Sequence, residues 1–258
     1  MDISIWQLKT MESSTQSPAH FVSEKRIIIA GAGIAGLAFA RALDRYWASG
    51  SPRPRIIIYE RDTQEVSVER EGYSLSIRSD SASGGMQALQ KLGLLDSMLE
   101  MSITGLQGQK GTFMLWDANW KPILKVKAPS QPPNGLPAPH MRIARNVLRR
   151  LLVDGLPSYV EVHWSSACGG VQRLPDGRVQ VELSDGGLDD CDIFIAADGA
   201  NSKLRAILRP DDKLCFAGAV CLSGSARFTA GVPEPVNENW GMLLGGGGTS
   251  LLDRKSVV

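Results

Sequence analysis

The chain has 258 residues, of which 43% are hydrophobic, and a formal net charge of +1. This length and apolar content allow one sizeable core and a smaller second one. The dispersed basic residues exclude a nucleic-acid partner on composition, and no apolar run approaches the roughly 18 residues that a membrane-spanning helix needs. Four cysteines without a C-x-x-C pair predict a reduced, cytoplasmic protein, and three histidines without ligand spacing predict no metal site.

The N-terminal residues 1–24 are polar and rich in Ser and Thr. They lack the cationic start and continuous apolar segment of a secretory signal, so a mobile extension is expected.

A dinucleotide-binding pattern follows this extension. Residues 26–30 form a β-branched run that is typical of a strand buried on both faces. Residues 31–36 read G-A-G-I-A-G and match G-x-G-x-x-G, and residues 37–43 predict a helix. After a Gly/Pro breaker, residues 55–59 predict a second strand, which ends at Glu60.

Each position of this pattern has a physical task. Gly31 permits the tight turn, Gly33 lets backbone amides approach a pyrophosphate, and Gly36 lets the helix pack closely on the strand. The phosphates would lie at the helix N-terminus, where free N–H groups and the helix dipole favour anions. Glu60 lies 24 residues beyond Gly36, where an acid accepts hydrogen bonds from an adenosine ribose. Its charge disfavours a 2′-phosphate and hence NADP in this slot, whereas FAD and NAD both remain open.

The remaining elements follow in chain order. Residues 72–78 alternate as an extended segment, residues 86–92 predict a helix that ends at Gly93, residues 105–126 predict a β-hairpin or meander, and residues 131–139 predict a proline-rich loop. We then expect a helix at 146–152, strands at 160–164, 170–173, 179–183 and 191–197, a helix at 202–208, and strands at 214–228 and 240–244.

Four segments together resemble one enzyme family: residues 31–36, the run Glu60-Arg61-Asp62, Arg145 with Leu148, and residues 198–205, which match D-G-x-x-S-x-x-R. The chain resembles FAD-dependent monooxygenases of the single-component aromatic-hydroxylase type over residues 25–209. Within that family, residues 72–95 and 145–149 look closest to the tetracycline-inactivating branch. The resemblance decides for FAD over NAD.

The resemblance also implies roles for individual residues. Gly31, Gly33 and Gly36 would hold the FAD pyrophosphate and Glu60 the adenosine ribose. Arg61 would lie near the adenine, Arg145 would reach the cofactor, and Asp198 would approach it from the end of a parallel strand. From the residues alone, a solvated arginine at a helix start is the favoured interpretation of Arg145, and an ordinary Asp-Gly turn is the alternative for Asp198.

The function implied by the resemblance is hydroxylation of a small or polycyclic organic substrate by FAD, NAD(P)H and oxygen, in secondary metabolism. The cofactor performs such chemistry, and no catalytic acid or base is identifiable in the sequence. Two alternatives stay open, a non-catalytic flavin-binding remnant and a flavin-dependent reductase or dehydrogenase. The sequence leaves the oligomeric state open.

The predicted fold class is α/β, a Rossmann-like FAD-binding domain with a parallel sheet and an incomplete β-rich substrate domain. We expect a division into residues 1–24, residues 25–212 with a β-rich insertion near 100–135, and residues 213–258. The family's C-terminal Gly-Asp segment has no counterpart here, since the sequence contains no Gly-Asp dipeptide. The expectation is therefore a chain that is truncated relative to the family.

Overall fold

The structure is a computed structural model of the chain. It describes residues 20–47, 50–69, 74–80, 82, 84–104, 112–127, 135–220, 222, 234, 240–245 and 247–253. The expected N-terminal extension therefore lies outside the described residues up to position 19, as do residues 131–134 of the predicted loop and residues 221 and 223–228 of the predicted strand 214–228.

A four-stranded parallel sheet forms the centre of the fold, in the order β12-β1-β2-β8. The strands are β1 (Arg26–Ala30), β2 (Arg55–Tyr59), β8 (Val160–His163) and β12 (Ile193–Ala196). The isoleucines of β1 and β2 alternate between two hydrophobic clusters, one on each face of the sheet. Burial on both faces explains why these strands read as continuous apolar runs, and it confirms the predicted strands 26–30 and 55–59.

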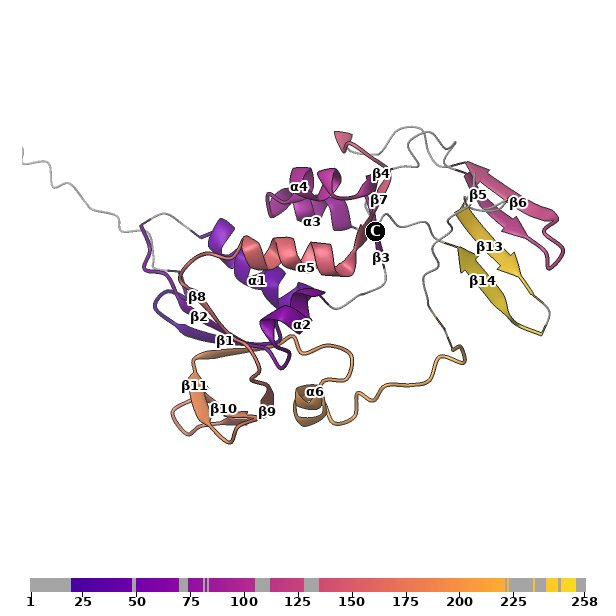
Figure 1. The fold of residues 1–258 in the computed structure, drawn as a ribbon. Helices are drawn as coiled ribbons and strands as arrows, with labels where there is room; N and C mark the ends of the chain where they lie inside the picture. The colour runs from indigo at the N-terminus through magenta and orange to yellow at the C-terminus, as the bar shows by residue number, and fades with distance from the viewer. Residues whose placement is uncertain are drawn as a thin grey trace, which may run out of the picture.

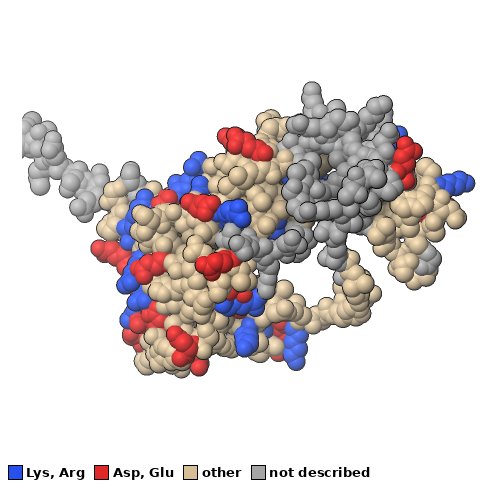
Figure 2. Space-filling model, viewed as in Figure 1, with Lys and Arg blue, Asp and Glu red and all other residues tan. Residues whose placement is uncertain are grey.

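Helices cover one face of this sheet and a β-meander covers the other (Figure 1). The helical layer contains α1 (Ile34–Arg45), α2 (Gln64–Glu69), α3 (Gly85–Lys91), α4 (Leu95–Glu100) and α5 (Arg145–Asp154). The meander has the order β11-β10-β9, from β9 (Cys168–Arg173), β10 (Val179–Leu183) and β11 (Leu188–Cys191), with α6 (Lys203–Leu208) against β9. We call these three layers the three-layer region. On its face seen in Figure 2, acidic and basic side chains are interspersed.

The predicted strand 191–197 is divided in the structure. Asp192 separates β11, which ends the meander, from β12, which joins the parallel sheet. The Asp192 carboxylate accepts a hydrogen bond from the Arg26 backbone N–H at 2.8 Å, and its own N–H donates to the Arg26 carbonyl. The chain thus changes layer at Asp192, which a continuous apolar reading could not reveal.

Two further sheets complete the fold. One has the order β3-β7-β4, from β3 (Ser74–Arg78), β7 (His140–Ala144) and β4 (Ile103–Thr104). The other, which we call the second sheet, has the order β14-β13-β5-β6, from β5 (Thr112–Trp116), β6 (Pro122–Lys127), β13 (Trp240–Leu244) and β14 (Ser250–Asp253). Because β5 pairs with β13, the predicted insertion and the C-terminal strands share one sheet.

The prediction of strand at 214–228 is wrong for its described residues 214–220. Residues 214–220 are exposed and, within the described part of the chain, belong to no strand. The predicted strand 240–244 is confirmed as β13. Within the described residues, no helix combines the length and apolar character that crossing a bilayer requires.

Candidate dinucleotide-binding site

The turn after β1 is packed against the segment that follows β12. Gly31 has φ +104°, in the left-handed region that favours glycine, and its N–H donates to the Tyr59 carbonyl at 2.8 Å. A Cβ on Gly31 would lie 2.5 Å from the carbonyl oxygen of Ala197. The turn therefore requires glycine at this position for two reasons, conformation and space.

The other two glycines of the motif have different surroundings. A Cβ on Gly36 would lie 2.2 Å from the Gly31 carbonyl oxygen and 3.1 Å from Ile29 Cγ2, so Gly36 is needed for the packing of α1 on the turn. The nearest atom to a Cβ on Gly33 would be the Ala197 carbonyl oxygen, at 3.9 Å. Of the three motif glycines, only Gly33 thus has room for a Cβ, whose nearest neighbour would lie at ordinary van der Waals distance.

This position lies at the N-terminus of α1. Gly33 is the N-cap of this 12-residue helix and provides no side chain to bond the first-turn N–H groups. Such N–H groups and the helix dipole attract an anion. The residues present therefore fit a dinucleotide diphosphate, since a side chain at Gly33 would fill the space that the phosphates need.

Glu60 lies beside this turn, at the carboxyl end of β2. Its side chain is buried, with the residue only 7% exposed. Its Oε2 accepts a hydrogen bond from the Ala32 N–H at 2.8 Å, and its Oε1 accepts one from the Asp62 N–H at 3.1 Å. The Glu60 N–H donates to the His163 carbonyl, which ties this corner to β8. The carboxylate is thus fixed against the backbone of the glycine turn.

A second buried charged residue completes this corner. Arg149, on α5, is 5% exposed; its Nε donates to the Ala32 carbonyl at 2.6 Å, and its Nη2 lies 3.2 Å from Glu60 Oε2. The sequence reasoning missed Arg149. A signal was present: Arg149 occupies the same helical stripe as Leu148 and Leu152, the buried residues of α5, whereas Arg150 is exposed. An arginine on an apolar stripe needs an internal partner.

The remaining predicted residues lie at different distances from this turn. Asp198 follows β12, and its Cα would be 3.1 Å from a Cβ on Gly31, so the structure brings it to the same edge of the sheet. Arg61 is on the surface, with its side chain 66% exposed and 3.6 Å from Asp62. Arg145 is the first residue of α5 and is half-buried; among the described residues its guanidinium has no hydrogen-bond or ion-pair partner.

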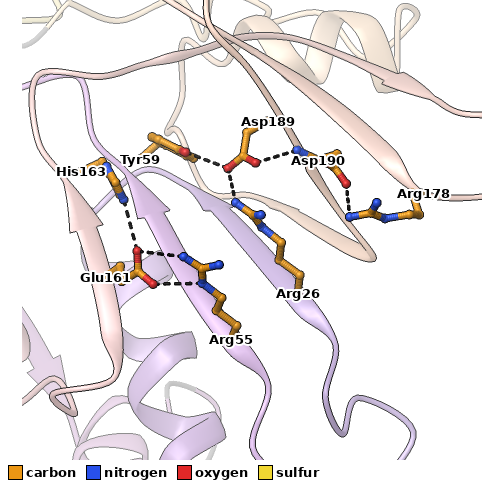
Figure 3. A network of polar contacts seen from close by, with 8 residues as sticks. All are labelled: Arg26, Arg55, Tyr59, Glu161, His163, Arg178, Asp189 and Asp190. Carbon is orange, nitrogen blue, oxygen red and sulfur yellow. Dashed lines mark hydrogen bonds and ion pairs between the residues drawn. The ribbon is translucent and has the colours of Figure 1, made fainter.

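The opposite face of the sheet carries a polar network that joins the layers (Figure 3). Asp189 of the meander accepts hydrogen bonds from Tyr59 Oη at 2.8 Å and Arg26 Nη2 at 2.6 Å. Burial and the Asp189 carboxylate raise the pKa of Tyr59 far above its ordinary value. Tyr59 therefore stays protonated as a hydrogen-bond donor, and the network acts as a structural joint.

No family model matches the chain. The monooxygenase cfoF of Aspergillus candidus is 39% identical over 233 residues, which cover 87% of this chain and 55% of that protein. A protein of Arthroderma benhamiae named "Probable FAD-dependent monooxygenase" is 30% identical over 198 residues, which cover 76% of this chain and 40% of that protein. The chain is related to the FAD-dependent monooxygenases. It spans about half the length of the curated relatives it matches.

Solved structures of monooxygenases also share the fold. The crystal structure of p-nitrophenol 4-monooxygenase PnpA from Pseudomonas putida DLL-E4 has a TM-score of 0.55 and 21% identity, and covers 72% of this chain and 44% of that chain. The predicted α/β fold and the resemblance to FAD-dependent monooxygenases are confirmed. The likeness to the tetracycline-inactivating branch and the roles of the individual site residues stay predictions.

Proposed function

We propose that the three-layer region binds FAD and that the chain forms the FAD-binding part of a monooxygenase. Such an enzyme uses NAD(P)H and oxygen to hydroxylate a small or polycyclic organic substrate, and we place it in secondary metabolism. The observation that carries this proposal is the room for a Cβ at Gly33, at the N-terminus of α1 and between two glycines whose surroundings exclude any side chain. The FAD-dependent relatives supply the identity of the dinucleotide.

The proposed roles follow from the position of each residue. The first-turn N–H groups of α1 and the backbone at Gly33 would bind the pyrophosphate, and Glu60 would accept a hydrogen bond from the adenosine ribose. The Arg145 guanidinium, without a protein partner among the described residues, would add a cation for the phosphates. Asp198 would approach the cofactor from β12, and Arg61 would lie beside the adenine. A cytoplasmic location remains a prediction from the cysteine usage.

Bound FAD would supply the redox chemistry, namely acceptance of a hydride and activation of oxygen. The residues of the chain would orient the dinucleotide, and the buried Glu60 corner would exclude water from the adenosine end. We assign no acid or base to a described residue.

The binding proposal is tested by Gly33→Val. The variant should remain folded, because the nearest atom to a Cβ there is 3.9 Å away, and should lose FAD because the side chain occupies the phosphate space. Gly169→Val is the matched control, since the nearest atom to a Cβ at Gly169 is 3.8 Å away and β9 lies in the meander layer. Visible flavin absorbance after desalting measures occupancy. Full occupancy in Gly33→Val would reject the proposed site.

The reaction class requires a separate experiment on the same chain. NAD(P)H oxidation and product formation are measured with labelled oxygen across a panel of aromatic and polycyclic compounds. Label in the product supports the monooxygenase. NAD(P)H oxidation that reduces an organic acceptor without label would indicate a reductase, and FAD binding without turnover would indicate a non-catalytic flavin-binding domain.

A further inference from the structure

The Arg149 guanidinium contacts two groups of the candidate site, one after the end of β1 and the other after the end of β2. Its Nε donates to the carbonyl of Ala32, in the glycine turn after β1, at 2.6 Å. Its Nη2 lies 3.2 Å from Oε2 of Glu60, after β2. Both charged residues are nearly fully buried, so the pair is shielded from solvent. The planar fork of arginine can hold two acceptors in fixed geometry, which a lysine ammonium cannot.

The acceptor capacity of Glu60 is almost used up by these contacts. Each carboxylate oxygen offers about two acceptor positions. Oε2 receives the Ala32 N–H at 2.8 Å and the Arg149 guanidinium, so both of its positions are occupied. Oε1 receives the Asp62 N–H at 3.1 Å. Counted over the described part of the chain, one acceptor position is left, and it is on Oε1.

We propose that Arg149 is a positioning residue that holds Oε2 of Glu60 against the glycine turn and leaves Oε1 to accept a single ribose hydroxyl. This inference rests on the proposed binding of an adenine dinucleotide. Arg149 touches no ligand in this arrangement. It acts through Glu60 and Ala32, and it also compensates a buried carboxylate that would be costly without a nearby cation.

The first test uses the unaltered chain and ligands that differ only in the ribose. FAD bound to the full chain is displaced with ADP, 2′-deoxy-ADP, 3′-deoxy-ADP and 2′,3′-dideoxy-ADP. We expect one of the two monodeoxy compounds to bind about tenfold more weakly than ADP, the size for one hydrogen bond to a charged acceptor. The other should match ADP, and the dideoxy compound should show no further loss. Tenfold losses for both monodeoxy compounds would mean that Glu60 accepts two hydroxyls and would overturn the inference.

The second test asks whether Arg149 sets this discrimination. Arg149→Met replaces the guanidinium with an apolar side chain of similar length. Arg150→Met is the control, because Arg150 is the next residue of the same helix and is exposed. We expect Arg149→Met to reduce the preference for ADP over 2′,3′-dideoxy-ADP from about tenfold to less than about threefold. Arg150→Met should keep the parent preference. A merely structural arginine would weaken both nucleotides equally and leave their ratio unchanged, and that result would overturn the inference.

Arg149→Lys covers the case in which the methionine variant does not fold. It keeps the charge without the fork, and we expect it to bind FAD but to lose part of the ribose preference. If neither variant folds, the monodeoxy comparison on the parent chain still decides. A parent chain that binds no FAD rejects the proposed function itself, whereas FAD binding with an unaltered ribose preference in a folded Arg149 variant rejects only the role of Arg149.

Discussion

Apolar side chains are buried to different extents in β1, at the centre of the three-layer region, and in β6 of the second sheet. In β1, consecutive isoleucines are at most 1% exposed, because helices cover one face and the meander covers the other. In β6, the consecutive residues Ile123 and Leu124 are 55% and 50% exposed, so both faces of this strand carry exposed apolar side chains. Burial on both faces therefore specifies β1, whereas β6 is defined more by its backbone pairing with β5, the strand of the second sheet that carries the buried Trp116.

Cysteine reactivity should give the largest contrast between the interior and the exposed connector after α6. Burial raises the pKa of the Cys168 thiol to about 12, and Cys215 lies exposed in the connector. Near about pH 8 roughly one Cys168 thiol in ten thousand is ionised, so its alkylation should be at least about a thousandfold slower than that of an ordinary exposed cysteine. Iodoacetamide labelling followed by mass spectrometry, in a Cys221→Ser background, measures both rates.

The control is the same reaction in urea, where both cysteines should react alike. Because the pKa of Cys168 is raised from 9.0, the folded state holds this proton more tightly than the unfolded state. The free energy of unfolding should therefore fall as the pH rises from about 9 toward 12. Equal labelling rates in the native protein would contradict the buried position of Cys168.

Two glycine substitutions test whether the three-layer region and the second sheet unfold independently. A Cβ on Gly36 would lie 2.2 Å from the Gly31 carbonyl, and one on Gly241 would lie 2.0 Å from the Met114 carbonyl. We expect Gly36→Ala to cost about 3 kcal/mol of unfolding free energy in the three-layer region, and Gly241→Ala to loosen the second sheet alone. Amide hydrogen exchange, resolved by segment, locates each effect. Gly169→Ala is the control, because the nearest atom to a Cβ there is at an ordinary contact distance of 3.8 Å. Exchange that rises in both regions for either variant would show that the two regions unfold as one.

The degree to which an element is buried also determines how well the sequence predicts it. The strands 26–30 and 55–59 were predicted to the residue, because continuous apolar runs between breakers allow few alternatives. β7 was missed because His140 and Arg142 interrupt its apolar residues and α5 begins without a break after it. β11 was missed because two of the four residues in its sequence, LDDC, are acidic.

The candidate site divides in a similar way. The glycines and Glu60 were found from the sequence, because the unit of strand, glycine turn, helix and second strand fixes their spacing along the chain. Arg149 could be placed only once α5 was oriented on the sheet, because its two partners lie 117 and 89 residues away in the chain. The spacing of residues along the chain does not predict a contact between residues so far apart in the sequence.

A smaller contrast concerns isoleucines in the two regions. Ile57, in β2, is 1% exposed, and Ile57→Ala should cost about 3 kcal/mol, as for a large-to-small change in a packed core. Ile123→Ala should change the unfolding free energy by less than about 0.5 kcal/mol, since this residue is already in solvent. Urea titrations of both variants against the parent measure the two values. A cost of about 3 kcal/mol at Ile123 would mean that β6 is buried in solution.

The smallest expected effect is at Asp192, where the chain passes from the meander into the parallel sheet. The Arg26 backbone N–H, with a lesser contribution from Lys25, holds the pKa of the Asp192 carboxyl below its ordinary value. A lowered pKa stabilises the folded state above the unfolded value near 3.8, and this stabilisation is lost as the pH falls through the folded value.

Asp192→Asn keeps an oxygen for the Arg26 N–H, so at neutral pH it should cost less than about 1 kcal/mol of unfolding free energy. The difference between parent and variant should then shrink as the solution is acidified below about pH 4, because the parent carboxyl becomes neutral as well. Lys25→Met separates the exposed ion pair, 3.4 Å long, from the backbone contact and should have the smaller effect of the two. Urea unfolding across this pH range measures all three proteins, and a difference that grows with acid would mean that the carboxylate charge does not stabilise the junction between the two layers.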